Sequence, residues 1–130
     1  MSDAGGPIRS VSAVTLATKD MPASTRFYEA IGFVRLYGGP ESEFTSYRVG
    51  SSYLNIQLDA AHAPGDRIWG RVIFWVADVD ETYAQVVDAG YPTTTTPCDA
   101  PWGERYFHVH DPDGHELSFA RPLDETRLVP

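Results

Sequence analysis

The sequence predicts an α+β protein built from two copies of one unit, each with a strand, a helix and three further strands. Two observations lead to this prediction. First, an aspartate suited to capping a helix recurs after 58 residues, at Asp20 and Asp78. Second, a glycine follows each aspartate by 12 residues, at Gly32 and Gly90, where a helix would end. An internal repeat of this length indicates two structurally similar modules in one chain.

The first module is expected to span about residues 8–58. An alternating run at residues 11–18 predicts its opening strand, and the helix should begin after Asp20 and end before Gly32. The breaks that follow contain glycine and serine, which separate short strands. The strand candidates of this part are Val34–Tyr37, Phe44–Val49 and Tyr53–Leu58.

The second module is expected at residues 70–122, after a polar linker at residues 59–69. Its helix should follow Asp78, and Glu81 lies three residues later, as in a capping box. Its predicted strands are Arg71–Ala77, Thr93–Thr96, Glu104–His110 and His115–Ala120. We expect both helices to cover one sheet face and the other face to form a ligand cleft. Residues 1–7 and 123–130 are expected to be tails, the first of them disordered.

The turn Asp111-Pro112-Asp113-Gly114 organises the last two strands. Proline presets the backbone, aspartate caps it, and glycine takes the left-handed conformation that closes a hairpin. Since side chains alternate along a strand, one face of this hairpin collects apolar residues. The other face collects Tyr106, His108, His110, Glu116 and Ser118. That face is too polar for a core and too aromatic for solvent, which indicates the wall of a binding site.

Alternation in the other strands extends this free face across both modules. The predicted ligand-binding residues are Tyr53, Asn55, Gln57, Arg71, Trp75, Trp102, Tyr106, His108 and Ser118. Aromatic rings among a few polar groups are typical of a small-molecule pocket. Arg71 would suit an anionic oxygen of a ligand, unless Glu104 or Glu116 neutralises it. The alternative for Trp75 and Tyr106 is packing at a module or dimer interface.

Composition excludes some partners. A net charge of −8 argues against nucleic acid, and an acidic surface is compatible with a cationic ligand. No apolar run is long enough to cross a membrane, and the first residues lack the pattern of a signal peptide. The single cysteine, Cys98, cannot form an internal disulfide, and we expect it to be a spectator thiol in a loop. A cytoplasmic location is therefore expected.

These motifs resemble a known family over roughly residues 8–122. Phe27-Tyr28 before Ile31-Gly32-Phe33, the run Val76-Ala77-Asp78-Val79-Asp80, and the closing DPDG turn are similar to the glyoxalase/bleomycin-resistance (vicinal oxygen chelate) superfamily. Within it, residues 101–107 (PWGERYF) look most like the antibiotic-binding, bleomycin-resistance branch. That resemblance implies a small, acidic, metal-free homodimer that sequesters a drug in a cleft.

The resemblance also bears on metal binding. Enzymes of this superfamily hold a divalent metal at positions that correspond here to Ala13, Gln57, Arg71 and Ser118. Only Gln57 offers a possible ligand, and the guanidinium of Arg71 would repel a metal ion. We therefore expect no metal or other cofactor, and a non-catalytic homodimer that binds a planar or aromatic small molecule.

An enzyme remains the alternative. A displaced metal site at His108, His110 and Glu116 would suit a lyase, isomerase or dioxygenase. Metal-free acid–base chemistry by Glu104 or Glu116 beside a histidine is a further possibility.

Overall fold

The computed structural model describes residues 6–65, 67–124 and 126, and within them the chain forms two four-stranded sheets and two helices. The first half contains β1 (Ala13–Thr18), α1 (Met21–Ala30), β2 (Val34–Tyr37), β3 (Phe44–Val49) and β4 (Ser52–Leu58). The second half contains β5 (Arg71–Trp75), α2 (Val79–Asp88), β6 (Cys98–Asp99), β7 (Glu104–His110) and β8 (Glu116–Pro122). The predicted fold class, an α+β protein of two βαβββ modules, is confirmed. The expected tails lie mostly outside the described residues.

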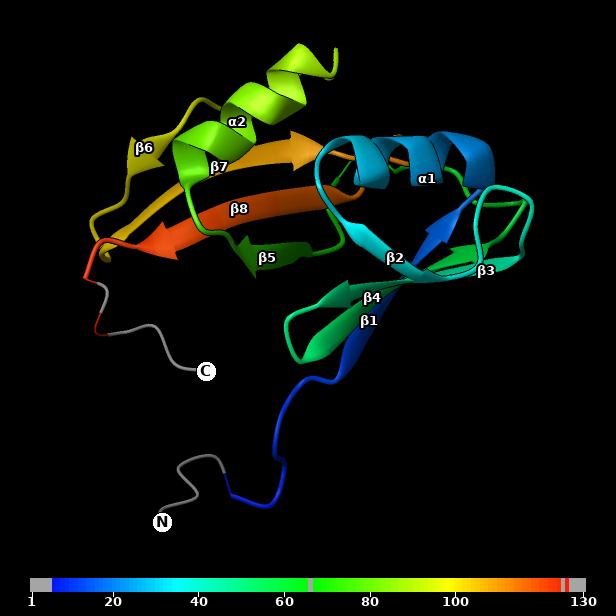
Figure 1. Ribbon diagram of the computed structural model, residues 1–130, viewed down its shortest axis with the longest axis horizontal. Helices are drawn as coiled ribbons and strands as arrows, with labels where there is room; N and C mark the ends of the chain where they lie inside the picture. The colour runs from blue at the N-terminus through cyan, green and yellow to red at the C-terminus, as the bar shows by residue number, and fades with distance from the viewer. Residues whose placement is uncertain (1–5, 66, 125, 127–130) are drawn as a thin grey trace.

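The two modules have the same topology. The strand orders are β1-β4-β3-β2 and β5-β8-β7-β6, so in each sheet the first strand of the module pairs in parallel with the last. Both helices lie on one side of the sheets, and the opposite side is left open (Figure 1). No helix in the described part of the chain is long and apolar enough to span a membrane.

The helix boundaries follow from local capping. Oδ1 of Asp20 accepts the Ala23 N–H at 3.0 Å, and Oδ1 of Asp78 accepts the Glu81 N–H at 3.0 Å. Gly32 lies just beyond the end of α1 at φ +113°, a conformation that L side chains rarely adopt. The helices occupy residues 21–30 and 79–88, which reproduces the 58-residue offset of the sequence repeat.

One predicted strand is wrong. Residues 93–96 form no strand, and the short β6 pairs with β7 at Cys98 and Asp99 instead. The amides of Thr94 and Thr95 both approach the His108 carbonyl, and Oγ1 of Thr95 accepts the His108 N–H at 3.0 Å. Threonine hydroxyls compete with backbone groups for hydrogen bonds, so this segment attaches to β7 without a regular ladder.

The two modules share one hydrophobic core. Phe33 of the first module packs edge-on against Phe74 of the second, with ring centroids 5.1 Å apart. Phe27 of α1 packs in the same manner against Tyr91, which follows α2, at 4.8 Å. Each module therefore loses a hydrophobic partner if the other is removed.

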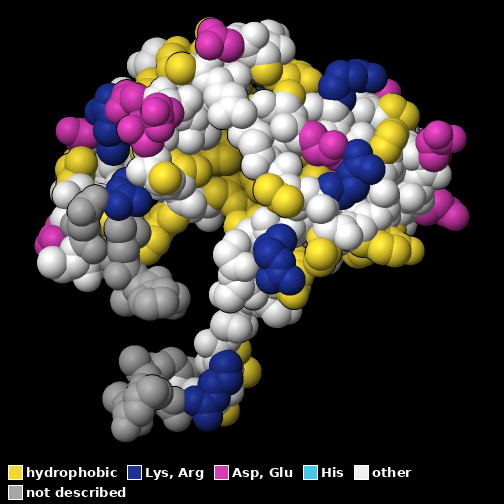
Figure 2. All heavy atoms as spheres, in the orientation of Figure 1, with side chains coloured by type: hydrophobic (Ala, Val, Ile, Leu, Met, Phe, Trp, Pro, Cys, Tyr) yellow, Lys and Arg dark blue, Asp and Glu magenta, His cyan; other side chains and the backbone are white. Residues whose placement is uncertain are grey.

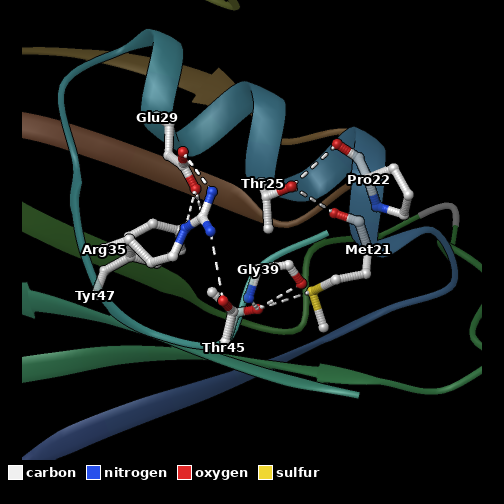
Figure 3. A network of polar contacts seen from close by, with 9 residues as sticks. Met21, Pro22, Thr25, Glu29, Arg35, Gly39, Thr45 and Tyr47 are labelled. Carbon is white, nitrogen blue, oxygen red and sulfur yellow. Dashed lines mark hydrogen bonds and ion pairs between the residues drawn. The ribbon is translucent and has the colours of Figure 1, made fainter. Parts of the chain in front are cut away.

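Polar contacts tie α1 to its sheet (Figure 3). The Glu29 carboxylate accepts hydrogen bonds from Arg35 at 2.8 and 2.9 Å and from the Tyr47 hydroxyl at 3.1 Å. The hydrogen bond from Arg35 lowers the pKa of Glu29, and burial raises the pKa of Tyr47. On the same sheet, Oγ1 of Thr45 accepts the Gly39 N–H at 3.0 Å. These contacts hold β2, the edge strand, under the helix.

The DPDG turn has the predicted geometry, with Gly114 at φ +86°. Oδ1 of Asp111 accepts the N–H groups of Asp113 and His115, each at 2.9 Å. Its Oδ2 accepts the hydroxyl of Tyr28, on α1, at 2.6 Å. Burial raises the pKa of Asp111. The turn therefore joins the second module to the first as well as closing its own hairpin.

His115, directly after the DPDG turn, is buried, although its place at a turn would have indicated a solvated side chain. Its Nδ1 accepts the indole N–H of Trp69 at 2.8 Å, and its Nε2 lies 2.8 Å from the carbonyl oxygen of Ala17. The ring of His62 lies beside it, with centroids 5.0 Å apart. His115 thus connects the segment between the modules to β1.

Candidate functional site

The open face of the second sheet gathers most of the predicted ligand-binding residues. Strand pairing arranges them in three rows from β7 through β8 to β5: His110, Glu116 and Arg71; His108, Ser118 and Ile73; and Tyr106, Ala120 and Trp75. Ser118 and Ala120 of the central strand are small and almost fully buried. Larger side chains from the flanking strands therefore form the exposed surface of this face.

Arg71 and Glu116 form an ion pair at one end of these rows. Both Nε and Nη2 of Arg71 contact Oε2 of Glu116, and Nε2 of His110 lies 3.5 Å from Oε1. Burial would raise the pKa of Glu116, but the hydrogen bond and charge of Arg71, assisted by His108 and His110, lower it. Glu116 therefore stays ionised at neutral pH and neutralises Arg71.

Three rings form a series along β7 and the loop before it. The rings of Trp102 and Tyr106 are stacked with centroids 5.9 Å apart, and those of Tyr106 and His108 are 4.9 Å apart. Trp102 is 65% exposed, and its indole N–H donates to Oε1 of Glu104 at 3.1 Å, which orients the ring. The outer end of the series thus presents an exposed, oriented aromatic surface.

His108 lies at the inner end of this series. Burial lowers its pKa, and the charge of Arg71 lowers it further, so the ring is neutral at pH 7. Its Nδ1 is buried and has no hydrogen-bond partner among the described residues.

On the open face of the first sheet, the predicted amides already have intramolecular partners. Oδ1 of Asn55 accepts the hydroxyl of Ser46 at 2.8 Å, and its Nδ2 donates to Oγ1 of Thr15 at 3.3 Å. Nε2 of Gln57 donates to the carbonyl oxygens of Glu43 and Leu58, at 3.1 and 3.3 Å. These bonds order both side chains.

Two pockets lie along the seam between the modules. One has a volume of about 230 Å³ and brings Tyr53 of β4 against Ile73 and Trp75 of β5. The other has about 330 Å³ and shares Val49, Phe74 and Trp75 with the first. In the space-filling view, hydrophobic side chains lie on the walls of the hollow between the two halves (Figure 2). The shared residues make the two pockets neighbours on either side of Trp75.

The predicted ligand-binding residues therefore fall into separate groups. Tyr53 and Trp75 meet at the seam, whereas Trp102, Tyr106 and His108 border neither seam pocket. Ser118 lies on β8, between β5 and β7, and Arg71 lies at the other end of β5 from Trp75.

Two features of the open face were missed in the sequence. Arg48 of β3 places its guanidinium 5.3 Å from the centroid of the Tyr53 ring, and it borders the larger seam pocket. Alternation along Phe44–Val49 would have placed Arg48 on this face. Cys98 was expected in a loop, but it lies in β6 opposite Tyr106.

Two of the positions that the family resemblance assigns to a metal, Ala13 and Gln57, are not level with one another here. Ala13 of β1 pairs with Tyr53 of β4, whereas Gln57 of β4 pairs with Ala17. Gln57 is therefore four residues further along the strands than Ala13, which is about 13 Å at the usual rise of a strand. Gln57 therefore cannot complete a metal site at Ala13.

The alternative metal site at His108, His110 and Glu116 is not assembled. Across the described residues, no three His, Cys, Asp or Glu side chains are placed to hold a metal ion. Oε2 of Glu116 is occupied by Arg71, and only His110 approaches the other oxygen.

The family of the chain is shown by comparison with known proteins. A sequence model of the Glyoxalase/Bleomycin resistance protein/Dioxygenase superfamily matches residues 10–119. The chain therefore belongs to this superfamily, as its motifs predict.

Solved structures share the fold. TioX from Micromonospora sp. ML1 is 28% identical, with a TM-score of 0.72, and the match covers 88% of this chain and 99% of TioX. A glyoxalase-related enzyme from Fulvimarina pelagi is 25% identical, with a TM-score of 0.68 and coverage of 87% and 88%. Lactoylglutathione lyase from Agrobacterium tumefaciens is 18% identical, with a TM-score of 0.70 and coverage of 88% and 94%, a likeness of fold alone.

Curated relatives match a smaller part. Uncharacterized proteins Rv0887c of Mycobacterium tuberculosis and Mb0911c of Mycobacterium bovis are 38% identical over 53 residues, or 41% of this chain. The matched part spans only 31% and 35% of their respective lengths.

Proposed function

We propose that this protein binds a planar, antibiotic-like aromatic molecule and acts by sequestering it, without metal chemistry. The proposal rests on the seam pocket that is lined by Tyr53 of the first module and Trp75 of the second. Two aromatic walls around a pocket of about 230 Å³ favour a flat ring system, because aromatic faces gain most from stacking. Trp102, Tyr106 and His108 extend the aromatic surface available to a larger ligand.

The residues at the superfamily's metal positions support binding over catalysis. Ala13 has no donor atom, and Ser118 is almost fully buried. Arg71 is a permanent cation held by Glu116, so this carboxylate is already committed to an ion pair. A bleomycin-resistance type of activity, in which affinity comes from stacking and burial, needs none of these groups as ligands.

We further propose that the working form is a cytoplasmic homodimer. Several large apolar side chains are exposed on the open side, among them Val34, Ile73 and Trp75. A second copy packed on this side would cover them and deepen the seam pockets, since association is driven by burial of apolar surface.

The test is a panel of planar antibiotics and simpler aromatic compounds, measured by the rise in melting temperature and by quenching of tryptophan fluorescence. We expect several members to stabilise the protein and quench its emission, because a ligand stabilises the state that binds it. No stabilisation by any planar compound would contradict the proposal. Stoichiometric zinc, iron, nickel or manganese in the purified protein, together with turnover, would favour the enzyme instead.

A further inference from the structure

We propose that Arg48 is the anion-recognising residue of the seam, so that the ligand is an aromatic acid and not an aromatic base. This inference rests on the proposed function, because it names the chemistry of the ligand at that same site. It assigns the contact with a ligand's carboxylate or phenolate oxygen to a residue of the first module, whereas the sequence pointed to Arg71 of the second.

The position of Arg48 supports this assignment. Among the described residues, it is the one charged side chain that lines the 330 Å³ pocket, whose other walls include Phe33, Phe74 and Trp75. Its cross-strand partner is Tyr53, which borders the 230 Å³ pocket. An anion on a ring held at Trp75 would therefore lie close to the guanidinium.

Three other arginines that lie on strands are already paired with carboxylates. Arg71 is neutralised by Glu116, and Arg35 by Glu29. Arg105 is paired with both Asp80 and Asp99. Within the described ranges of the chain, no carboxylate lies within ion-pair distance of Arg48, and its guanidinium lies over the ring of Tyr53. In a chain with a net charge of −8, a cation without an acidic partner in an apolar pocket is available to a ligand.

The geometry leaves the donors of Arg48 usable. A guanidinium above an aromatic ring contacts the ring with the face of the guanidinium plane. The N–H groups of the guanidinium point outward in that plane, in a fork that matches a carboxylate. Arg48 is exposed at the border of the pocket, so water screens the pairing and its contribution is expected to be moderate. The overall negative charge opposes it little, because salt screens charges beyond about 8 Å at physiological ionic strength.

The experiment compares 2-naphthoate with its neutral analogue 2-naphthamide by titration calorimetry at pH 7. The wild-type protein should bind 2-naphthoate about tenfold more tightly, the advantage expected of a charge-assisted contact. Arg48→Gln should remove this advantage and leave the affinity for 2-naphthamide unchanged. Arg48→Lys should retain part of it, because an ammonium keeps the charge without the fork.

Arg26→Gln is the matched control, since it removes the same charge from the exposed side of α1. It should leave both affinities unchanged, and circular dichroism with melting curves should show all variants folded. The inference would be overturned if the wild-type protein bound the two probes equally or did not bind 2-naphthoate. It would also be overturned if Arg26→Gln and Arg48→Gln lost the same affinity for 2-naphthoate. If 2-naphthamide or other neutral planar compounds still bind, the proposed function survives that failure. If no planar compound binds at all, both fail.

Discussion

Gly114 is a position where both the backbone and its surroundings restrict the residue. Its φ of +86° is left-handed, and a Cβ built there would lie 2.6 Å from Cβ of Pro64 in the segment between the modules. Turn conformation and close approach therefore both require glycine.

We expect Gly114→Val to lower the free energy of unfolding by about 1–3 kcal/mol, because a β-branched residue is strained at this φ and also meets Pro64. Urea denaturation measures the change. Gly70→Val is the matched control, since a Cβ at Gly70 meets nothing within 4 Å and its φ is not left-handed. An unchanged midpoint for Gly114→Val would show that the turn tolerates side chains.

Trp102 allows ligand binding to be tested apart from folding. Because its ring is mostly exposed, Trp102→Ala should leave the melting temperature unchanged. It should weaken binding of a planar ligand large enough to reach from the seam to the Trp102 ring by about 1–3 kcal/mol, the usual cost of losing an aromatic anchor. Titration calorimetry measures the affinity. Tyr37→Ala, which removes another exposed ring from β2, should have no effect. Equal affinities in wild type and Trp102→Ala would remove this residue from the site.

At the scale of the elements, the pairing of β5 with β8 decides the charge of the open face. It places Arg71 level with Glu116, and the ion pair that results neutralises the cation expected to attract an anionic ligand. The neighbouring strand thus removes the predicted role of Arg71 as a free cation, although Arg71 lies on the predicted face.

This pairing has a pH dependence. The pKa of Glu116 is lowered in the folded protein. The stabilisation by ionised Glu116 is therefore complete above the ordinary pKa of glutamate, and it is lost as pH falls through the lowered pKa. Glu116→Gln should cost about 1 kcal/mol at pH 7, a modest loss because Arg71 is partly hydrated. Unfolding curves from about pH 3 to 7 should converge for variant and wild type at the acidic end. A difference independent of pH would contradict the ion pair.

At the scale of the whole molecule, the shared core makes the modules interdependent, and exposed apolar side chains remain on the open side. We therefore expect a dimer at about micromolar concentration, since such surfaces favour association. Sedimentation velocity over a range of concentrations measures it. A monomer at every concentration would contradict this prediction.

Chelation tests the whole site for a metal. Treatment with EDTA should change neither the melting temperature nor the affinity for a planar ligand, because Ala13 has no donor atom, Arg71 is a cation and Ser118 offers only a buried, neutral hydroxyl. Loss of binding that added metal restores would contradict this, and His108, His110 and Glu116 would then be the first residues to replace.

The sequence by itself determined the modules and their helices. Capping aspartates and terminal glycines act within a few residues, so their 58-residue repeat predicts α1, α2 and the paired topology without tertiary information. The same local reasoning failed at residues 93–96. Threonine favours strands, but the structure of this segment depends on hydrogen bonds to His108, which is distant in sequence.

Alternation along strands also determined which side chains share the open face, since that period is a property of the extended backbone. Only the tertiary structure decided their partners. It neutralised Arg71 with Glu116, buried His115 between Trp69 and Ala17, and placed the exposed Arg48 at the border of a pocket that Trp75 also lines. These partners are distant in sequence, and charge and burial depend on neighbours in space. The fold therefore follows from patterns that are local in sequence, whereas the chemistry of the open face follows from contacts that only folding creates.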